Sequence, residues 1–267
     1  MTSYALAGTP SVPGDLAAKG INVPGSRPQP NPGPLASELT LPVVGELTGL
    51  FPGGGLPRGA TVLLGPLAAP DTLGSASGTS PYVPPRRAPG LTSLLLLLLA
   101  GSSSRGHWCA VVGLPELGLA AALEMGVDLE RLILVPRPGS QGRWQSVVTT
   151  LLETVDLVCL APETPVHPAD ARRLSARARE RRSTLVVLDA ASPPGAARGL
   201  LWAGPGRAGR VLSRWSGPCD LRCAVRESSW SGLELGHGLL GLRQLEAEIG
   251  GRGAASRPRR GHLRLPA

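Results

Sequence analysis

The chain has 267 residues, of which 42% are hydrophobic and 3% aromatic, and it carries a formal net charge of +8 at pH 7. This length holds one full α/β domain with tails or two small domains, and the core must consist mainly of Leu, Val and Ala. Four cysteines and an N-terminus without a basic, apolar leader exclude a secreted disulfide scaffold and indicate a cytoplasmic protein. The leucine run at residues 94–99 is too short to span a bilayer, so no membrane partner is expected.

Residues 1–36 form a Pro-rich leader without an apolar period, and we expect it to be disordered. Residues 37–50 predict one or two short helices broken near Pro42, before a glycine turn at residues 51–55. Apolar runs then alternate with helical patterns, which predicts strands at residues 61–64, 108–113, 131–135, 155–160 and 185–188, and helices at residues 92–103, 117–125, 144–153 and 168–182. Strands of nearly continuous apolar residues indicate a parallel sheet covered by helices on both faces.

The pattern changes after residue 190, where Gly, Pro and Ser become more frequent. Alternating apolar residues predict antiparallel pairs with one solvent-facing side, with strands at residues 211–215, 221–226, 243–249 and 262–265. The predicted fold class is α/β, with a mostly parallel sheet flanked by helices and a short antiparallel C-terminal extension. We expect three parts, which are the leader at residues 1–36, a core at 37–190 with a mobile insertion at 67–89, and a strand-rich, basic, partner-binding segment at 191–267.

The strand at residues 61–64 and the helix at residues 92–103 frame an interrupted phosphate-binding loop. Such a loop needs glycines, a lysine and a hydroxyl for Mg²⁺. The lysine is missing, because Leu91 occupies its position and Lys19, the only lysine, lies in the leader. Thr92 also suits the first turn of a helix that binds no ligand. We therefore predict a vestigial nucleotide site, made of Gly65, Gly90, Thr92 and Ser93.

From about residue 47 to residue 188, the order of these motifs resembles the RecA-like ATPase core. The segment LTGLFPGGGLPRGATVLLGP is similar to the helix, glycine turn and first core strand of RecA, and VDLVCLAP is similar to its Walker B strand. WCAVVGLPELGLAAALEMGVDLERLILVPRP is similar to the strand, acidic loop and following segment of that core. The C-terminal part, with SSWSGLELGHG and GGRGAASRPRR, is not like RecA but is similar to actinobacterial RecA-like proteins of the ImuA type, the mutasome accessory factors.

Phosphoryl transfer by this fold needs a lysine, a Walker B acid and a glutamate that orients water. By the resemblance, the Walker B position is Ala161 and the glutamate position is Pro115, with Glu116 one residue later, where it also suits the first turn of a helix. Asp156 stands at the start of its strand, roughly 16 Å from the strand's end, and is too far away to hold the same metal. The resemblance therefore implies no catalytic residues, no ATP hydrolysis and no resident cofactor, while weak binding of ATP and Mg²⁺ stays open.

Arginines and one tryptophan are the candidate contacts for DNA or a partner. One group lies on the predicted helix at residues 168–182 and consists of Arg173, Arg177 and Arg181. A second group lies near the C-terminus and consists of Arg252, Arg257, Arg259 and Arg260. The helix group either contacts phosphates or an acidic partner, or is a solvated face, whereas the C-terminal group is expected to become ordered on a partner. Trp230 is either a partner anchor or a plug of the core at the end of the sheet.

The cysteines give a weaker signal. Cys219 and Cys223 form a C-x3-C pattern, and His237 and His262 follow downstream, so a zinc site is conceivable. Because the spacing is loose and Cys223 also fits an apolar strand face, we predict no metal site. The other two cysteines lie within predicted strands and are expected to be small core residues, namely Cys109 and Cys159.

The residues favour an assembly role over catalysis, and the resemblance implies a non-hydrolysing RecA-like accessory protein of SOS-type, error-prone translesion DNA synthesis. By the resemblance, it would bridge or recruit a Y-family polymerase homologue and an error-prone replicative-type polymerase at damaged DNA in the cytoplasm, near the nucleoid. Single-stranded DNA is a further expected partner. Two alternatives stay open, a DNA-dependent ATPase or recombinase-like enzyme and a simple single-stranded DNA-binding module, which the basic charge also favours.

Overall fold

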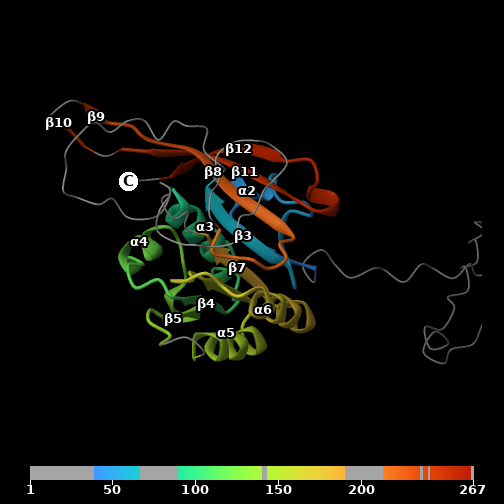
Figure 1. Cartoon of the computed structure of the whole chain (residues 1–267). Coiled ribbons are helices and arrows are strands. Elements are labelled where there is room, and N and C mark those ends of the chain that lie inside the picture. The colour runs from blue at the N-terminus through green and yellow to red at the C-terminus, as the bar shows by residue number, and fades with distance from the viewer. Residues whose placement is uncertain are drawn as a thin grey trace, which may run out of the picture. The chain divides into compact units, whose positions relative to one another are not determined.

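The computed structural model (Figure 1) describes residues 39–66, 90–139, 143–189, 213–234, 237–239 and 241–265. All of them lie in Pro34–Ala267, the second of the two units into which the chain divides. The disordered leader, the mobile insertion at residues 67–89 and the boundary at residue 190 are predictions that lie outside the described residues. Among the described residues, no helix has the length and hydropathy that crossing a bilayer requires.

A central sheet organises the fold, and its eight strands are β3 (Thr61–Pro66), β4 (Cys109–Val112), β5 (Leu132–Val135), β6 (Leu157–Leu160), β7 (Thr184–Leu188), β8 (Leu221–Trp230), β11 (Arg243–Gly251) and β12 (Arg259–Leu265). They are hydrogen-bonded in the order β12-β11-β8-β3-β7-β6-β4-β5. Neighbouring strands from β8 to β5 are parallel, whereas β11 pairs antiparallel with both β8 and β12. The predicted α/β class, with a mostly parallel sheet and a short antiparallel extension, is confirmed.

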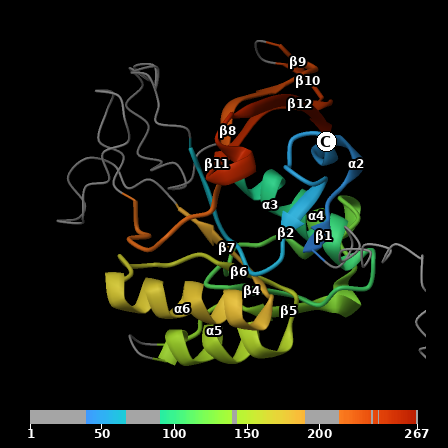
Figure 2. The same ribbon diagram turned by 90° about the vertical axis from the view of Figure 1, so that its right-hand side faces the viewer.

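Helices cover both faces of the parallel strands (Figure 2). They are α2 (Gly45–Thr48), α3 (Leu91–Ser103), α4 (Leu119–Glu124), α5 (Arg143–Thr154) and α6 (Pro168–Arg181), with 3-10 turns at Leu129–Arg131 and Gly253–Ala255. α5 and α6 lie side by side on one face of the sheet, and α3 lies on the other. Two small antiparallel pairs complete the described structure, β1 (Thr40–Pro42) with β2 (Gly55–Pro57) and β9 (Leu233–Glu234) with β10 (His237–Gly238).

Alternation along each parallel strand supplies one hydrophobic core to each face. Val111 of β4 and Cys159 of β6 belong to the α3 side, whereas Val112 and Leu160, their next neighbours, belong to the α5–α6 side. All four are almost completely buried, as expected for strands covered on both faces. Burial raises the pKa of Cys109 to about 12 and also raises that of Cys159. The prediction that these two cysteines are core residues is confirmed.

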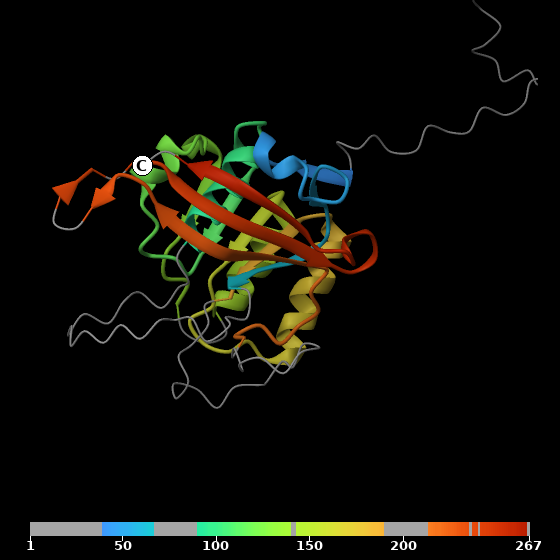
Figure 3. The ribbon, with the colours of Figure 1, turned by 90° about the horizontal axis from the view of Figure 1, so that it is seen from above.

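The antiparallel strands β8, β11 and β12 are covered on one face only (Figure 3). Val225 and Leu245 point inward and join the core around α3. On the outer face, Glu248 accepts hydrogen bonds from Arg226 at 2.9 Å and from Arg260 at 2.7 Å. The predicted antiparallel pairs with one solvent-facing side are confirmed.

Two predictions near the ends of the core need correction. Of the one or two short helices predicted at residues 37–50, one is present as α2 after the expected break near Pro42, but residues 40–42 form a strand, because the glycine turn brings Gly55–Pro57 back alongside them. The described part of residues 211–215 forms no strand, since Trp215 makes only an isolated bridge to Val166.

The basic C-terminal segment is also different from its prediction. Residues 262–265 form a strand as predicted, but the strand begins at Arg259, so Arg259 and Arg260, which were expected to become ordered on a partner, belong to the edge strand of the sheet. The reason is its alternation, which buries Leu263 and Leu265 in the core around α3 while Arg264 between them stays exposed.

Candidate functional site

The junction between β3 and α3 lies at the carboxyl ends of the parallel strands, where open α/β sheets bind ligands. Gly90 precedes α3 with a φ of 93°, a left-handed conformation that favours glycine. A Cβ atom there would lie 2.7 Å from Leu245 and 3.1 Å from Val225, on β11 and β8. Gly90 is therefore explained by the close approach of the antiparallel strands, without any ligand.

The first turn of α3 contains the position that the resemblance assigns to the phosphate lysine. Leu91, which stands there, is 1% exposed and belongs to the hydrophobic core. Thr92 is half-buried, and Ser93 accepts a hydrogen bond from Nη1 of Arg243 at 2.9 Å. The structure thus brings Gly90, Thr92 and Ser93 together, and it engages the Ser93 hydroxyl within the chain.

Arg243, at the start of β11, was missed by the sequence analysis. Its guanidinium also donates to the hydroxyl of Ser228 at 3.1 Å and stacks over the ring of Trp230 at 4.9 Å. Burial lowers the pKa of the Arg243 side chain. No local signal marks it, because it reaches Ser93 across 150 positions of sequence. Only the pairing of β8 with β11 places a cation at the start of α3.

Asp189 is a second residue that the sequence analysis missed, and it directly follows β7. Gly65 lies beside it, since a Cβ at Gly65 would be 3.4 Å from the Asp189 carbonyl oxygen. The carboxylate is 3% exposed, and Oδ1 accepts from the backbone N–H of Arg214 at 2.7 Å. Burial raises the pKa of Asp189, although hydrogen bonds from Ser213 and Arg214 oppose that rise. An acid closing a buried strand, as in TLVVLD, is the signal that could have found it.

The two positions expected for catalytic acids carry no charge. Ala161 is 6% exposed and follows β6, and its N–H donates to Val112 at 2.8 Å. Gly113 follows β4 and packs so closely that a Cβ there would lie 2.4 Å from the Ala161 carbonyl oxygen. Pro115 and Glu116 lie beyond it and are both exposed. The carboxyl ends of β4 and β6 are therefore held together by backbone contacts.

Asp156 lies at the opposite, amino end of β6. Its Oδ1 accepts from Arg58 at 2.7 Å, and its Oδ2 lies 3.4 Å from His107 and accepts from the N–H of Trp108 at 3.2 Å. Burial would raise the pKa of Asp156, but the hydrogen bond from Arg58 and the charges of His107 and Arg58 outweigh it and hold the pKa below its ordinary value. This carboxylate thereby links the segment before β3 and the segment before β4 to the amino end of β6.

Among the described residues, no cluster of three or more His, Cys, Asp or Glu side chains could hold a metal. Cys223 is fully buried on the inner face of β8, whereas His262 lies opposite Glu246, among the outer residues of β12. The Cys219 thiol donates to the carbonyl of Leu221 at 2.8 Å, and burial raises its pKa.

The arginine row on α6 is largely engaged in ion pairs. Arg177 bonds Glu180 at 2.8 Å and also Glu153 of α5, and Arg173 lies 3.9 Å from Asp170. Arg181 is exposed. Each exposed pair contributes little to stability. The described contacts fit a solvated helix face better than a continuous cationic stripe.

The C-terminal arginines divide into two kinds. Arg259 donates to the carbonyl oxygens of Gly49 and Phe51, at 3.3 and 3.5 Å, and Arg260 bonds Glu248. The side chains of Arg252 and Arg257 are exposed on the turn between β11 and β12. Trp230 is 38% exposed at the end of β8, so of its two expected roles it does not fill that of a plug of the core.

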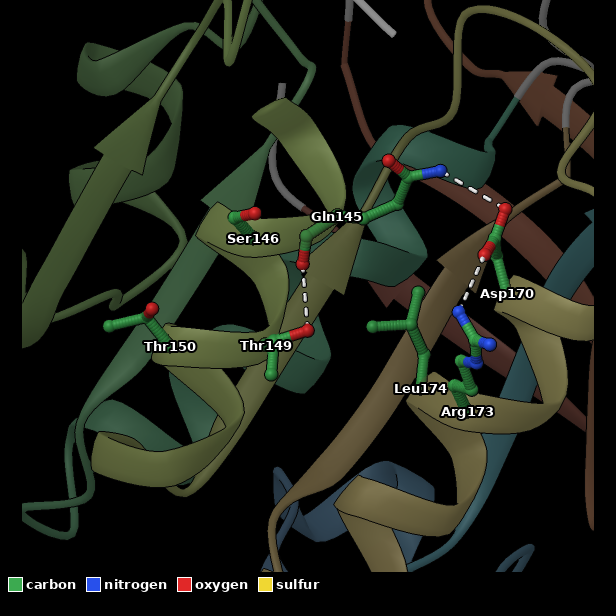
Figure 4. A pocket seen from close by; sticks show the side chains of 7 residues that line it. All are labelled: Gln145, Ser146, Thr149, Thr150, Asp170, Arg173 and Leu174. Carbon is green, nitrogen blue, oxygen red and sulfur yellow. Dashed lines mark hydrogen bonds and ion pairs between the residues drawn. The ribbon is translucent and has the colours of Figure 1, made fainter. Parts of the chain in front are cut away.

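A groove of about 400 Å³ lies between α5 and α6 (Figure 4). Asp170 reaches across it and accepts from Gln145 at 3.1 Å, while Thr149 bonds the carbonyl of Gln145 within α5. Leu174 contributes an apolar side chain. The Gln145 amide and the Asp170 carboxylate bond each other across the groove, so these two side chains connect α5 with α6.

Similarity to known proteins covers about half of the chain. A family model described as the MT3502 N-terminal domain matches residues 76–194. The chain is similar to a protein of Mycobacterium tuberculosis (strain ATCC 25618 / H37Rv) named uncharacterized protein Rv3395c, with 38% identity over 139 residues. The match covers 51% of this chain, and it spans 61% of the length of the relative.

Proposed function

We propose that this protein is a RecA-like accessory factor that does not hydrolyse ATP and that recruits polymerase components during error-prone translesion synthesis. One observation carries the proposal, namely that side chains in the first turn of α3 are already engaged within the protein. Leu91 lies in the core, and the Ser93 hydroxyl is bonded to Arg243. A phosphate loop needs a free lysine at the first of these positions, and its hydroxyl for Mg²⁺ belongs to the residue after the lysine, which here is Thr92.

The RecA-like assignment rests on the order of the motifs and on their places in the fold. A parallel sheet covered by helices on both faces positions β3 before the α3 junction and β6 at the expected Walker B strand. These placements support the resemblance, as does the smaller antiparallel extension. The resemblance to ImuA-type factors adds the pathway, including a Y-family polymerase homologue, an error-prone replicative-type polymerase and a place near the nucleoid.

The loss of hydrolysis follows from chemistry at three positions. Phosphoryl transfer needs charge on the phosphates, on the metal and beside the attacking water. Leu91, Ala161 and Pro115 supply none of these, and the nearby carboxylate of Asp189 is occupied by Arg214. We therefore assign no catalytic residue, no metal and no cofactor to the protein.

Assembly would use surfaces instead of a catalytic site. Arg252 and Arg257 are the best candidates for a partner or single-stranded DNA, because their side chains are exposed on a turn at the end of the sheet. Arg259 and Arg260 are poorer candidates, because both bond within the chain. Trp230 lies on the exposed end of β8, where an aromatic side chain suits a protein contact.

The test is a binding assay between the purified chain and the two polymerases of its own host, with the double variant Arg252→Glu, Arg257→Glu as the probe. We expect wild type to bind at least one polymerase and the variant to lose about tenfold in affinity. Arg181→Glu on α6 is the matched control and should bind like wild type. Absence of any polymerase binding by wild type would overturn the proposal.

The same preparation distinguishes the two alternatives. A DNA-dependent ATPase would release phosphate in the presence of single-stranded DNA and lose that activity in Thr92→Ala. A simple DNA-binding module would bind single-stranded DNA tightly, with a steep dependence on salt, and would ignore both polymerases. Either result would replace the accessory role.

A further inference from the structure

The short helix α4 exposes apolar side chains that the fold does not use. Leu119 is 45% exposed and Leu123 is 61% exposed. They are four residues apart and therefore lie on one side of the helix. Among the residues of α4, only Ala122 is buried. An exposed leucine pair beside further apolar surface is typical of an interaction site, whereas isolated exposed leucines are ordinary.

That further surface is an apolar groove at the C-terminal end of α4. It has a volume of about 360 Å³, and α3, α2 and the end of β12 contribute to it. Leu97, Met125 and Leu265 supply its apolar lining. Glu124 of α4 and Met125, which directly follows it, line the groove, so the groove adjoins the end of the helix that carries Leu123. Met is the side chain that adapts most readily to a variable apolar ligand.

Acidic side chains outnumber basic ones both in the lining of the groove and in the segment that contains α4. The chain carries a net charge of +8, yet residues 106–130 contain Glu116, Glu124, Asp128 and Glu130 and no Lys or Arg. Glu124 also lines the groove, and Glu46 faces it from α2. Arg264 is the basic side chain within the described lining. An apolar surface with an acidic rim favours a ligand that is apolar and positively charged.

We propose that the α4 surface, made of Leu119, Leu123 and the adjoining groove, binds a basic amphipathic helix of a partner protein. Leucine-like side chains of that helix, spaced by three or four residues, would contact the exposed leucines and enter the groove. Its Lys or Arg residues would lie against Glu46 and Glu124. The acidic rim disfavours nucleic acid at this surface, because both carry negative charge. The inference goes beyond the proposed function and does not depend on it.

The test measures binding of a fluorescein-labelled model helix in which leucines form one face and lysines the other, at low and at physiological salt. The variants are Leu119→Ser with Leu123→Ser, and Glu46→Gln with Glu124→Gln. The control variant is Leu239→Ser, which changes an 86% exposed leucine outside the α4 surface. A second peptide, with every lysine replaced by glutamate, tests the charge requirement. Thermal unfolding of each variant confirms that it is folded.

We expect the basic peptide to bind wild type and Leu239→Ser equally. The leucine double variant should lose about tenfold or more in affinity. The glutamine double variant should lose about threefold at low salt and less at physiological salt. The acidic peptide should bind at least about tenfold more weakly than the basic one.

Three results would overturn the proposal. The first is the absence of binding to wild type, and the second is equal binding to the leucine double variant. The third comes from sedimentation velocity, if wild type is a dimer and the leucine double variant is a monomer, because the surface would then be covered by a second copy of the chain. None of these results depends on whether a polymerase binds, so a failure here is distinct from a failure of the proposed function.

Discussion

At the amino ends of the parallel strands, Asp156 joins Arg58 and His107 in a compact charged cluster. At the carboxyl ends, where the resemblance places catalysis, Leu91 and Ala161 are apolar and buried. The charged groups near the carboxyl ends, Asp189 and Arg243, bond within the chain. The position of a charged group on the sheet therefore does not by itself indicate a catalytic role. What matters is whether that group already forms hydrogen bonds or ion pairs with its neighbours.

The largest expected effect concerns Gly113 at the carboxyl edge. Gly113→Ala should lower the free energy of unfolding by about 3 kcal/mol, because the residue has a positive φ and its Cβ would collide with the Ala161 carbonyl oxygen. Gly126→Ala is the matched control, since it has a φ of 86° but open space around it, and it should cost about 1 kcal/mol. Denaturant unfolding of both variants measures the difference. Equal losses would show that the close approach does not constrain this edge.

The second effect concerns the amino edge. Asp156→Asn should lower the free energy of unfolding by about 2 kcal/mol at neutral pH, because Arg58 loses its charged partner in a half-buried place. Asp170→Asn, which weakens a more loosely bonded carboxylate on α6, should cost only about 0.5 kcal/mol. Chemical denaturation checks both values. If the two variants are equally stable, the charged cluster is not a structural element of this edge.

The third effect concerns Arg243. Arg243→Gln should lower the free energy of unfolding by about 1 kcal/mol, because it removes the bonds to Ser93 and Ser228 while both hydroxyls remain able to bind water. Arg181→Gln on exposed α6 should change stability by less than about 0.5 kcal/mol. Arg243→Gln also tests the α3 junction. If this variant binds ATP and wild type does not, the Arg243 side chain is what keeps nucleotide from the junction.

The smallest effect is a contrast in pH dependence between the two edges. The pKa of Asp156 is lowered below 3.8, so ionisation favours the folded state, and this stabilisation is present above that value and lost as the pH falls through the folded-state pKa. The pKa of Asp189 is raised above 3.8, so its contribution is greatest below that value and is lost as the pH rises through the folded-state pKa.

Unfolding free energies of wild type, Asp156→Asn and Asp189→Asn, measured between about pH 3 and pH 7, separate the two signs. The advantage of wild type over Asp156→Asn should shrink as the pH falls. The advantage of wild type over Asp189→Asn should grow over the same range. Parallel curves for the two variants would contradict the contrast.

Much of the fold could be predicted from local pattern. The strand at Thr61–Pro66 and the helix at Leu91–Ser103 lie within a few residues of their predicted bounds, because continuous apolar runs and a helical period are local signals. Residues 40–42 were misassigned, since their pairing with residues 55–57 decides their conformation. The order of the C-terminal arginine segment was likewise hidden, because it depends on the register between β11 and β12.

The candidate site was only half visible. Gly65, Gly90, Thr92 and Ser93 could be found by motif, and all four lie at the β3–α3 junction. Arg243 and Asp189 could not be placed there, because their partners are distant in sequence or belong to loops without a pattern. The α4 surface was hidden for a related reason. Leu119 and Leu123 look like core residues of an amphipathic helix until the packing leaves them exposed.

The sequence by itself determined the α/β class and the absence of a phosphate lysine, because both depend only on residue types and their order. It also determined the basic net charge and the acidic character of residues 106–130. Which of these charged groups can contact a ligand or a partner depends on the tertiary structure. It bonds Arg243 to Ser93 and Asp189 to Arg214, and it leaves Leu123 61% exposed. Availability depends on contacts between distant segments, and such contacts form only when the sheet is assembled.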